Sequence, residues 1–449
     1  MPTIVNKSNI KVPNVKSPQK PLQVMAEYSN VSFPFFKKFG TFIFGEKNSK
    51  LIKYSPDNQI KIPPPGEGLP RVIHYCADQS GCAFWRMLWP SEELLAHNKA
   101  VVMTLYQMVT IGQFYLGIDA VKLQRQCTPP QLEFIKFLRG VSDQIKKDTG
   151  KGFRIIWEVD DVVCPAQDIP DYNVCKSAFE GDSVLNTVRE MMKYVDEMTV
   201  VSEYMKNHYK KWLNFDKISV IPNYAPKNWF DKGFDIDNIT KKYNKHKSKP
   251  RILYAGSGTH FDVSNKVGQK DDFGHVVESI IKDITIDKKY EWVFFGAMPM
   301  KLRQFVNKGI EFHDWTAITD YTEKLKSLDV DLCIAPLQDN NFSRSKANIK
   351  LTEAGMQGIP CIAQNLDCYN FNGWKYLFDT SAQMFQIMEQ LLKDQETYIS
   401  AVKYVRDYAS QYILQDHLDE HMLIYTTEYG SEKRKENKYF YQNNLEQFN

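Results

Sequence analysis

Residues 334–363 read IAPLQDNNFSRSKANIKLTEAGMQGIPCIA, and this stretch decides the fold. Apolar runs at Asp331–Pro336 and Pro360–Ala363 predict two strands. Between them, a polar loop leads into a predicted helix over Ser345–Gly358, which Gly358 ends. Strand, loop, helix and strand in this order make one β–α–β unit of a parallel sheet.

The same alternation extends to both sides of this stretch. Apolar strands are predicted at Arg71–Cys76, Phe153–Val159 and Arg251–Ala255, and an amphipathic helix at Pro129–Lys147. The pattern predicts an α/β chain with two doubly wound parallel sheets. We expect five parts, with bounds 1–66, 67–226, 227–400, 401–429 and 430–449.

Length and composition agree with two globular domains. The chain has 449 residues, of which 43% are hydrophobic and 25% charged. With a mean hydropathy of -0.44 and no apolar run near the ~18 residues that a bilayer requires, no transmembrane segment is predicted. The eight cysteines form no CxxC pair, so neither a zinc site nor a redox motif is indicated. We therefore expect a cytoplasmic, reducing location.

The net charge of +3 hides an asymmetry between the N-terminal arm and the rest of the chain. Residues 1–62 hold ten lysines and three acids, a balance of +7, so the remaining residues sum to −4. Such a segment is either a solvated, disordered arm or an arm that contacts a polyanion. Both interpretations are open at this level.

The predicted helix over Ser345–Gly358 carries groups suited to a nucleoside diphosphate. Its N-terminus, with Asn341, Ser343 or Ser345 as N-cap, is expected at the carboxyl edge of the sheet, where exposed N–H groups favour phosphate. Lys346, Lys350 and Glu353 fall at i, i+4 and i+7 of one helical face. The lysines suit phosphates and the carboxylate suits ribose hydroxyls. The alternative is a Lys350–Glu353 surface ion pair.

A glycine-rich turn follows the strand at Arg251–Ala255. Its backbone amides can approach a diphosphate, and His260 either binds phosphate or caps the loop. The candidate phosphate-binding residues of this turn are Gly256, Ser257, Thr259 and His260. The GxGxxG pattern is absent, which argues against a dinucleotide oxidoreductase.

The first domain offers weaker candidates. Gly81 and Arg86 follow its first strand, and Arg86, one turn into the next helix, either reaches a phosphate or acceptor or is a packed, salt-bridged arginine. Asp160 and Asp161 end a later strand. They bind a metal, or orient an acceptor hydroxyl or act as a base, or serve only as helix N-cap or turn acids. Ser202 directly follows the strand at 197–201.

Residues 341–363 resemble the nucleotide-sugar motif of GT-B glycosyltransferases, especially the GT4-like group. Asn223, within Ile221-Pro222-Asn223, is similar to the interdomain hinge of that family. One departure is that Ser345 stands where the family usually has a glutamate. The resemblance implies two Rossmann-like domains facing a cleft, with an N-terminal extension. In this arrangement, residues 67–226 form the acceptor domain and residues 227–400 form the nucleotide-sugar domain. A C-terminal helix within residues 401–429 packs back on them.

The same resemblance implies retaining transfer from a UDP-sugar of glucose or arabinose type, with no metal and no cofactor required. Glu353 would hold the donor ribose, and Lys346 and Lys350 would lie near the diphosphate. The implied donor-binding residues are Gly81, Gly256, Ser257, Thr259, His260, Ser345, Lys346, Asn348, Lys350 and Glu353. The implied catalytic residues are Asp160, Asp161 and Lys350, and the acceptor contacts are Arg86, Ser202 and Lys206.

The acceptor is predicted from charge and composition. Lys206, Lys210 and Lys211 form a basic cluster, which together with the basic arm suits a nucleic-acid backbone. The Lys-, Asn-, Tyr- and Phe-rich composition is similar to that of T4-like phage enzymes that glycosylate 5-hydroxymethylcytosine in DNA. DNA is therefore the first acceptor to test, in the host cytoplasm if a phage encodes the protein. The alternatives are a cytosolic or membrane-peripheral transferase of surface polysaccharide or glycolipid synthesis, and a non-enzymatic binding module.

Overall fold

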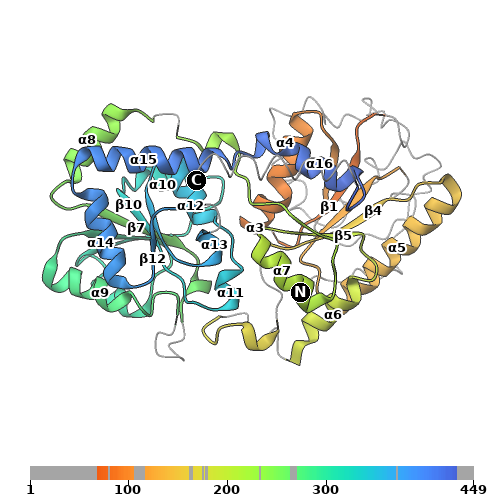
Figure 1. Ribbon diagram of the computed structural model, residues 1–449, viewed down its shortest axis with the longest axis horizontal. Helices are drawn as coiled ribbons and strands as arrows, with labels where there is room; N and C mark the ends of the chain where they lie inside the picture. Colours follow the sequence, from red (N-terminus) through yellow and green to blue (C-terminus); the bar gives the residue numbers. More distant parts are fainter. Residues whose placement is uncertain are drawn as a thin grey trace.

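The computed structural model describes residues 68–78, 81–105, 117–160, 165–173, 176, 181–231, 234–262, 271–370 and 373–431. They form two α/β domains that lie side by side (Figure 1). The predicted arm 1–66 lies outside the described residues, as does the tail 430–449 except for Gly430 and Ser431. None of the helices within these ranges is long and apolar enough to cross a bilayer.

The N-terminal domain is built on six parallel strands in the order β2-β1-β3-β4-β5-β6. Their bounds are β1 Arg71–Tyr75, β2 Val101–Leu105, β3 Ala120–Gln124, β4 Arg154–Glu158, β5 Glu197–Val200 and β6 Ile218–Val220. The helices are α3 Gly81–Ala83, α4 Trp89–Ala96, α5 Pro129–Thr149, α6 Ser183–Met191 and α7 Glu203–Leu213. The strands β1, β3 and β5 are buried throughout, as expected for a sheet covered on both faces.

The C-terminal domain repeats this plan, with parallel strands in the order β12-β11-β10-β7-β8-β9. The strands are β7 Arg251–Gly256, β8 Glu291–Gly296, β9 Ile310–Asp314, β10 Leu332–Ala335, β11 Cys361–Gln364 and β12 Leu377–Phe378. The helices are α8 Ile236–His246, α9 Val277–Lys282, α10 Tyr321–Ser327, α11 Asn341–Arg344, α12 Ile349–Met356, α13 Asp367–Asn370, α14 Ser381–Leu392 and α15 Gln395–Ser410. The last helix, α16 Leu418–Thr426, lies on the N-terminal domain. The two doubly wound sheets confirm the predicted GT-B arrangement.

The helix predicted over Ser345–Gly358 is wrong in its first four residues. The structure has two helices, α11 and α12, with residues 345–348 between them. Asn340 caps α11, because its Oδ1 accepts a hydrogen bond of 2.8 Å from the backbone of Ser343. The Ser345 hydroxyl donates to the carbonyl of Asn341 instead of capping a longer helix. Gly358 follows the end of α12 with φ +67, as predicted.

The chain crosses between the domains twice, and the two crossings pair with each other. The first follows β6, and the second runs from α15, on the C-terminal domain, to α16, which packs on α4 (Figure 1). Ala225 in the first crossing donates to the carbonyl of Tyr412 at 2.9 Å and accepts from the amide of Leu414 at 2.9 Å. The interdomain connection is therefore a two-stranded hinge.

A buried ionic triad lies under this hinge. The Glu158 carboxylate accepts from Arg86 Nε at 2.8 Å and lies 2.8 Å from Lys122 Nζ, and all three side chains are at most 1% exposed. Burial alone would raise the pKa of Glu158, but the two cations lower it to about 2. Arg86 also donates to the carbonyl oxygens of Ile221 and Pro222, at 2.6 and 3.1 Å. The triad thus holds β4, β3 and the hinge together.

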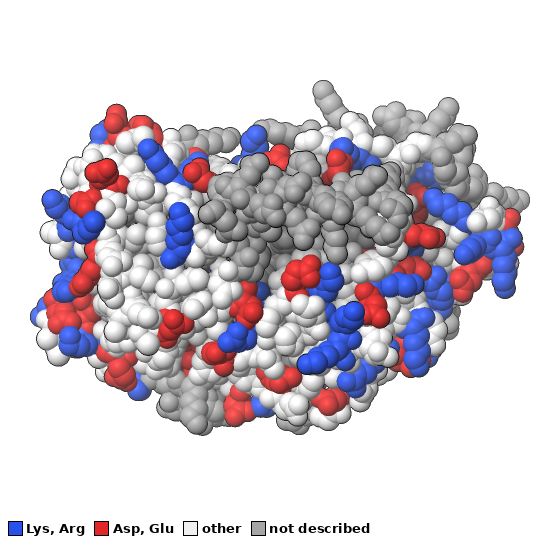
Figure 2. All heavy atoms as spheres, viewed as in Figure 1, with Lys and Arg blue, Asp and Glu red and all other residues white. Residues whose placement is uncertain are grey.

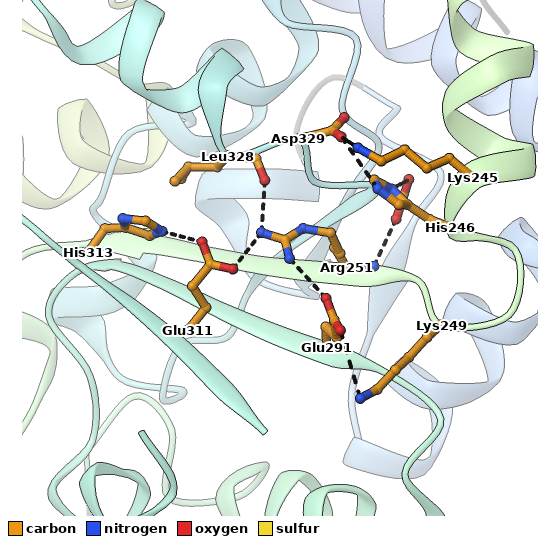
Figure 3. A network of polar contacts seen from close by, with 10 residues as sticks. Lys245, His246, Lys249, Arg251, Glu291, Glu311, His313, Leu328 and Asp329 are labelled. Atoms are coloured by element: carbon orange, nitrogen blue, oxygen red, sulfur yellow. Dashed lines mark hydrogen bonds and ion pairs between the residues drawn. The ribbon is translucent and has the colours of Figure 1, made fainter. Parts of the chain in front are cut away.

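A second polar network lies in the C-terminal domain, at the amino ends of its strands and so at the opposite edge of the sheet from their carboxyl ends (Figure 3). Arg251, at the start of β7, donates to Glu291 of β8 at 2.9 Å and to Glu311 of β9 at 2.7 Å. Its backbone N–H donates to Asp331 at 2.8 Å. These contacts tie together the starts of three neighbouring strands.

Replacing Glu158 by Gln should destabilise the protein by about 3–5 kcal/mol, because two buried cations lose their counter-charge. The measurement is urea unfolding followed by circular dichroism. Since the folded pKa lies below the unfolded value, the stabilisation is present above about pH 4.5 and is lost as pH falls toward 2. Glu389→Gln, which removes an exposed ion pair with Lys289, is the matched control and should change stability little. Equal stability of the two variants would contradict the role of the triad.

Candidate functional site

The carboxyl ends of β7, β8 and β10 face the N-terminal domain, and α12 brings Lys350 to this edge. The Lys350 amine donates a hydrogen bond to the carbonyl of Ala255 and lies 4.6 Å from the ring centroid of Tyr254. Burial lowers the pKa of Lys350. A cation held in a partly dry position interacts strongly with an arriving anion, because little water screens it.

Gly256, at the end of β7, makes room for this amine. A Cβ at this position would lie 2.8 Å from Lys350 Nζ and 2.6 Å from the Tyr254 hydroxyl. Tyr254 cannot move aside, because it packs within an aromatic cluster that includes Phe273, with centroids 4.6 Å apart. Glycine is therefore required here by contact and not by backbone conformation.

Glu353 lies near Lys350 on α12 and is held by Tyr321 at the start of α10. The Tyr321 hydroxyl donates to Glu353 Oε2 at 2.9 Å. Burial raises the pKa of Glu353 to about 7, against the opposing effects of Lys350 and of this hydrogen bond. The sequence predicted that Lys346, Lys350 and Glu353 share one helical face. Only Lys350 and Glu353 lie on the same helix, because Lys346 precedes α12.

His260 is fixed by a buried carboxylate. Its Nδ1 bonds to Asp272 Oδ2 at 2.7 Å, and Asp272 is fully buried. Burial, together with the nearby positive charge of Lys346, lowers the pKa of His260 to about 4. The ring is therefore neutral at neutral pH, with its proton on Nδ1, and Nε2 is the nitrogen left for a ligand.

The other predicted donor residues divide into two groups. Lys346 is half-buried, with its amine 4.9 Å from the ring centroid of Phe342, and it lies on the His260 side of the site. The Ser257 and Thr259 hydroxyls bond to each other at 2.7 Å in the turn after Gly256. Ser345 and Asn348 are buried, and Asn348 donates to the Tyr408 hydroxyl at 2.9 Å. These last two side chains brace the loop before α12, so their placement does not support direct ligand contact.

In the N-terminal domain, Asp160 lies at the carboxyl edge just beyond β4. Its Oδ1 is 3.7 Å from Arg125 Nε, and Arg125 also pairs with Asp78. Arg125 follows β3 with φ +48. Three charged side chains, from the segments that follow β1, β3 and β4, thus gather at one edge. Asp161 lies outside the described residues.

Two of the predicted acceptor contacts have structural roles instead. Arg86 is 1% exposed and belongs to the triad and hinge, so burial removes it from the cleft surface. Ser202 is the N-cap of α7, where its hydroxyl accepts from the amide of Met205 at 3.2 Å. Lys206 remains partly exposed and pairs with Glu203 at 3.4 Å.

Gly81, in contrast, has no described side chain or backbone against the position of a Cβ. A Cβ there would meet no described atom within 4 Å. The structure therefore leaves room at this position for an approaching ligand.

Sequence reasoning missed Trp315, which follows β9. Its side chain is 58% exposed, yet its ring lies against Phe295 and Tyr321, with centroids 6.1 and 6.4 Å apart. Gly296, with φ +97, lies beneath it, and a Cβ there would collide with the indole. An exposed ring that is backed by two other rings at the sheet edge is suited to stack on a planar ligand. This role of Trp315 can be recognised only from the residues that surround it in space.

No group of three or more His, Cys, Asp and Glu side chains able to hold a metal ion occurs in the part of the chain described here.

Comparison with known proteins shows likeness at the level of structure alone. No family model and no curated protein matches the sequence. Among solved structures, HepE (Alr3699) of Anabaena in complex with UDP superposes with a TM-score of 0.51 at 10% identity, covering 79% of this chain and 98% of HepE. The complexes with UDP-glucose, and with UDP and glucose, give TM-scores of 0.51 and 0.50 at 11% identity, covering 78% and 79% of this chain and 98% of HepE. At 10–11% identity, these matches show a shared fold and nothing finer.

Gly256→Ala should displace the Lys350 amine, reduce UDP affinity about tenfold and cost about 1–3 kcal/mol of stability through overpacking against Tyr254. Calorimetric titration with UDP and thermal unfolding measure the two effects. Gly140→Ala is the matched control, because Gly140 is exposed in α5 with nothing within 4 Å of its added Cβ. It should be neutral or stabilising by up to about 1 kcal/mol. Unchanged UDP affinity in Gly256→Ala would contradict the predicted contact.

Proposed function

We propose that the protein is a glycosyltransferase that uses a UDP-sugar donor. The observation that carries this proposal is the contiguous series of Lys350, Glu353 and Trp315 along one sheet edge. Glu353 bonds to Tyr321 at 2.9 Å, and the Tyr321 ring lies 6.4 Å from that of Trp315. A nucleoside diphosphate presents phosphate, ribose and base in the same order. The shared fold with HepE, which was crystallised with UDP and with UDP-glucose, supports the same ligand class.

Each part of this donor has a chemical counterpart in the site. Lys350, Lys346 and the amides after Gly256 would neutralise the diphosphate, and His260 Nε2 would take a proton from solvent as the anion raises its pKa. The Glu353 carboxylate would accept hydrogen bonds from ribose hydroxyls. The exposed face of Trp315 would stack on the base.

Catalysis would consist mainly of stabilising the leaving group. The bond between the anomeric carbon and the UDP oxygen breaks, the acceptor oxygen bonds to that carbon, and the acceptor proton passes to the departing phosphate oxygen. Lys350 lowers the barrier because charge builds up on that phosphate. Asp160 would orient the acceptor hydroxyl from the opposite domain. The family resemblance favours retention, with attack and departure on the same face of the sugar.

Two acceptor classes are supported by different observations. A DNA acceptor is favoured by the +7 balance of residues 1–62. The likeness in composition to T4-like phage enzymes adds 5-hydroxymethylcytosine as the base that would carry the accepting hydroxyl. The described lysines give less support, since Lys206 pairs with Glu203 and Lys210 with Asp216, and acidic and basic side chains are mixed over the face in Figure 2.

A saccharide or glycolipid hydroxyl is favoured by the interdomain cavity. This cavity has a volume of about 550 Å³ and is lined by Gln167–Tyr172 and Gln338–Asn341 together with Arg344. Its carboxylates and amides suit hydroxyl groups, and three aspartates against one arginine would repel a polyanion. This is the second candidate.

Lys350→Ala and Glu353→Ala should each reduce sugar transfer by about 10²–10³-fold, because each removes a group that contacts the donor. The assay is release of UDP from UDP-glucose in the presence of acceptor, with circular dichroism to verify folding. Lys289→Ala, an exposed lysine on the far edge of the domain, is the control and should be fully active. Turnover like wild type in either site variant would refute the assignment.

The ratio of UDP-glucose affinity in the wild type to that in Glu353→Gln should rise about three- to tenfold between about pH 6 and pH 8. Glu353 has a pKa of about 7 in the free protein, and ribose hydroxyls bind its carboxylate more strongly than its neutral form. UDP-glucose is the probe because its diphosphate has no group that titrates in this range. Glu353→Gln keeps the shape without the charge, and taking the ratio cancels the proton uptake by His260, which both proteins share. A pH-independent ratio would contradict the role of Glu353.

Incubation with UDP-sugars and one acceptor of each class decides between the acceptors. The panel contains hydroxymethylated DNA, plain DNA and neutral oligosaccharides, and the products are read by mass. Transfer to hydroxymethylated DNA alone would support the DNA candidate, and deleting residues 1–62 should then weaken binding steeply. Transfer to a saccharide alone would support the second candidate.

A further inference from the structure

The two domains meet where the loop after β4 and helix α7 contact Asp272 and the start of α11. Tyr172 Oη donates to Asp272 Oδ1 at 2.7 Å, and Asn341 Nδ2 donates to Asp168 Oδ1 at 3.2 Å. Tyr204 Oη, on α7, donates to Asn341 Oδ1 at 3.1 Å. All three hydrogen bonds join side chains of opposite domains across the cleft.

One of these contacts reaches the site itself, because it ends on the carboxylate that holds His260. Asp272 Oδ1 accepts from Tyr172 and from the amide of Gln338, at 2.7 and 3.0 Å. Asp272 Oδ2 bonds to His260 Nδ1 at 2.7 Å. Tyr172 is 5% exposed and Asp272 fully buried. A single buried carboxylate is thus shared between a tyrosine of one domain and a histidine of the other.

The carboxylate depends on all of its donors. Burial alone would raise the pKa of Asp272, but the hydrogen bond from His260 and the nearby Lys346 lower it. Opening the cleft removes Tyr172, and a buried carboxylate that loses a donor either takes up water or turns toward another partner. In both cases the direction in which Asp272 holds the His260 ring changes.

We propose that Tyr172 is a positioning residue that couples closure of the two domains to the orientation of His260 through Asp272. The relevance to catalysis rests on the proposed function, in which His260 Nε2 contacts the donor diphosphate. In the closed form Tyr172, Asp272 and His260 form one chain of hydrogen bonds. In the open form His260 is held less firmly, so the donor site is complete only when both domains surround the substrates.

The test compares Tyr172→Phe, which removes only the hydroxyl, with Tyr204→Phe, which removes another interdomain hydroxyl that does not reach Asp272. Protein labelled with ¹⁵N in the histidine rings reports on His260 directly, and His260→Gln assigns its signals. Tyr172→Phe should shift the His260 ring signals without any nucleotide, whereas Tyr204→Phe should leave them unchanged. Unaltered His260 signals in Tyr172→Phe, or equal shifts in both variants, would overturn the coupling.

A double-mutant cycle separates positioning from simple stabilisation. Tyr172→Phe should lower kcat for transfer from UDP-glucose about tenfold or more in the wild-type background, but have little further effect in His260→Gln. The same loss in both backgrounds would show a merely structural role. If the wild type neither binds nor turns over UDP-glucose, the proposed function fails, while the ring signals still decide the coupling.

Discussion

The carboxylate of Glu158 is the interaction on which the geometry of the cleft depends. It balances two cations in the buried interior, and one of these, Arg86, extends past it to the carbonyls of Ile221 and Pro222. The point at which the chain leaves the first domain is therefore fixed by charge and not only by apolar packing. The hinge connects the first domain to the second sheet. The orientation in which the carboxyl edges of the two sheets face each other therefore depends on a contact inside the first domain.

The groups at the second edge are all positioned before any ligand arrives. Lys350 rests on the carbonyl of Ala255, Glu353 on Tyr321 and His260 on Asp272. Such pre-organisation lowers the reorganisation needed when charge develops. It also shifts two pKa values, because burial raises that of Glu353 to about 7 and lowers that of His260 to about 4.

The sequence predicted the two sheets and the pair of Lys350 and Glu353, because both are encoded by local periodicity. It failed where a residue's role depends on distant neighbours. Arg86 follows a glycine turn like a cleft residue, and only its contacts with Glu158, 72 positions away, show that it is buried. Tyr172 and Asp272 are 100 residues apart, and Trp315 is distinguished only by the ring and glycine beneath it. The helix was predicted to begin at Ser345, four residues too early. The prediction did not consider that Ser and Asn side chains readily bond to nearby backbone groups and so interrupt a helix.

The return of the chain in α16 has a consequence for synthesis. His74 of β1 completes its hydrogen bonds with Tyr425, which lies 351 residues later. The first domain is therefore discontinuous along the chain, and it reaches its final form only after the second domain has emerged from the ribosome. Vectorial folding, in which each domain closes as it is made, does not apply to the one that is made first.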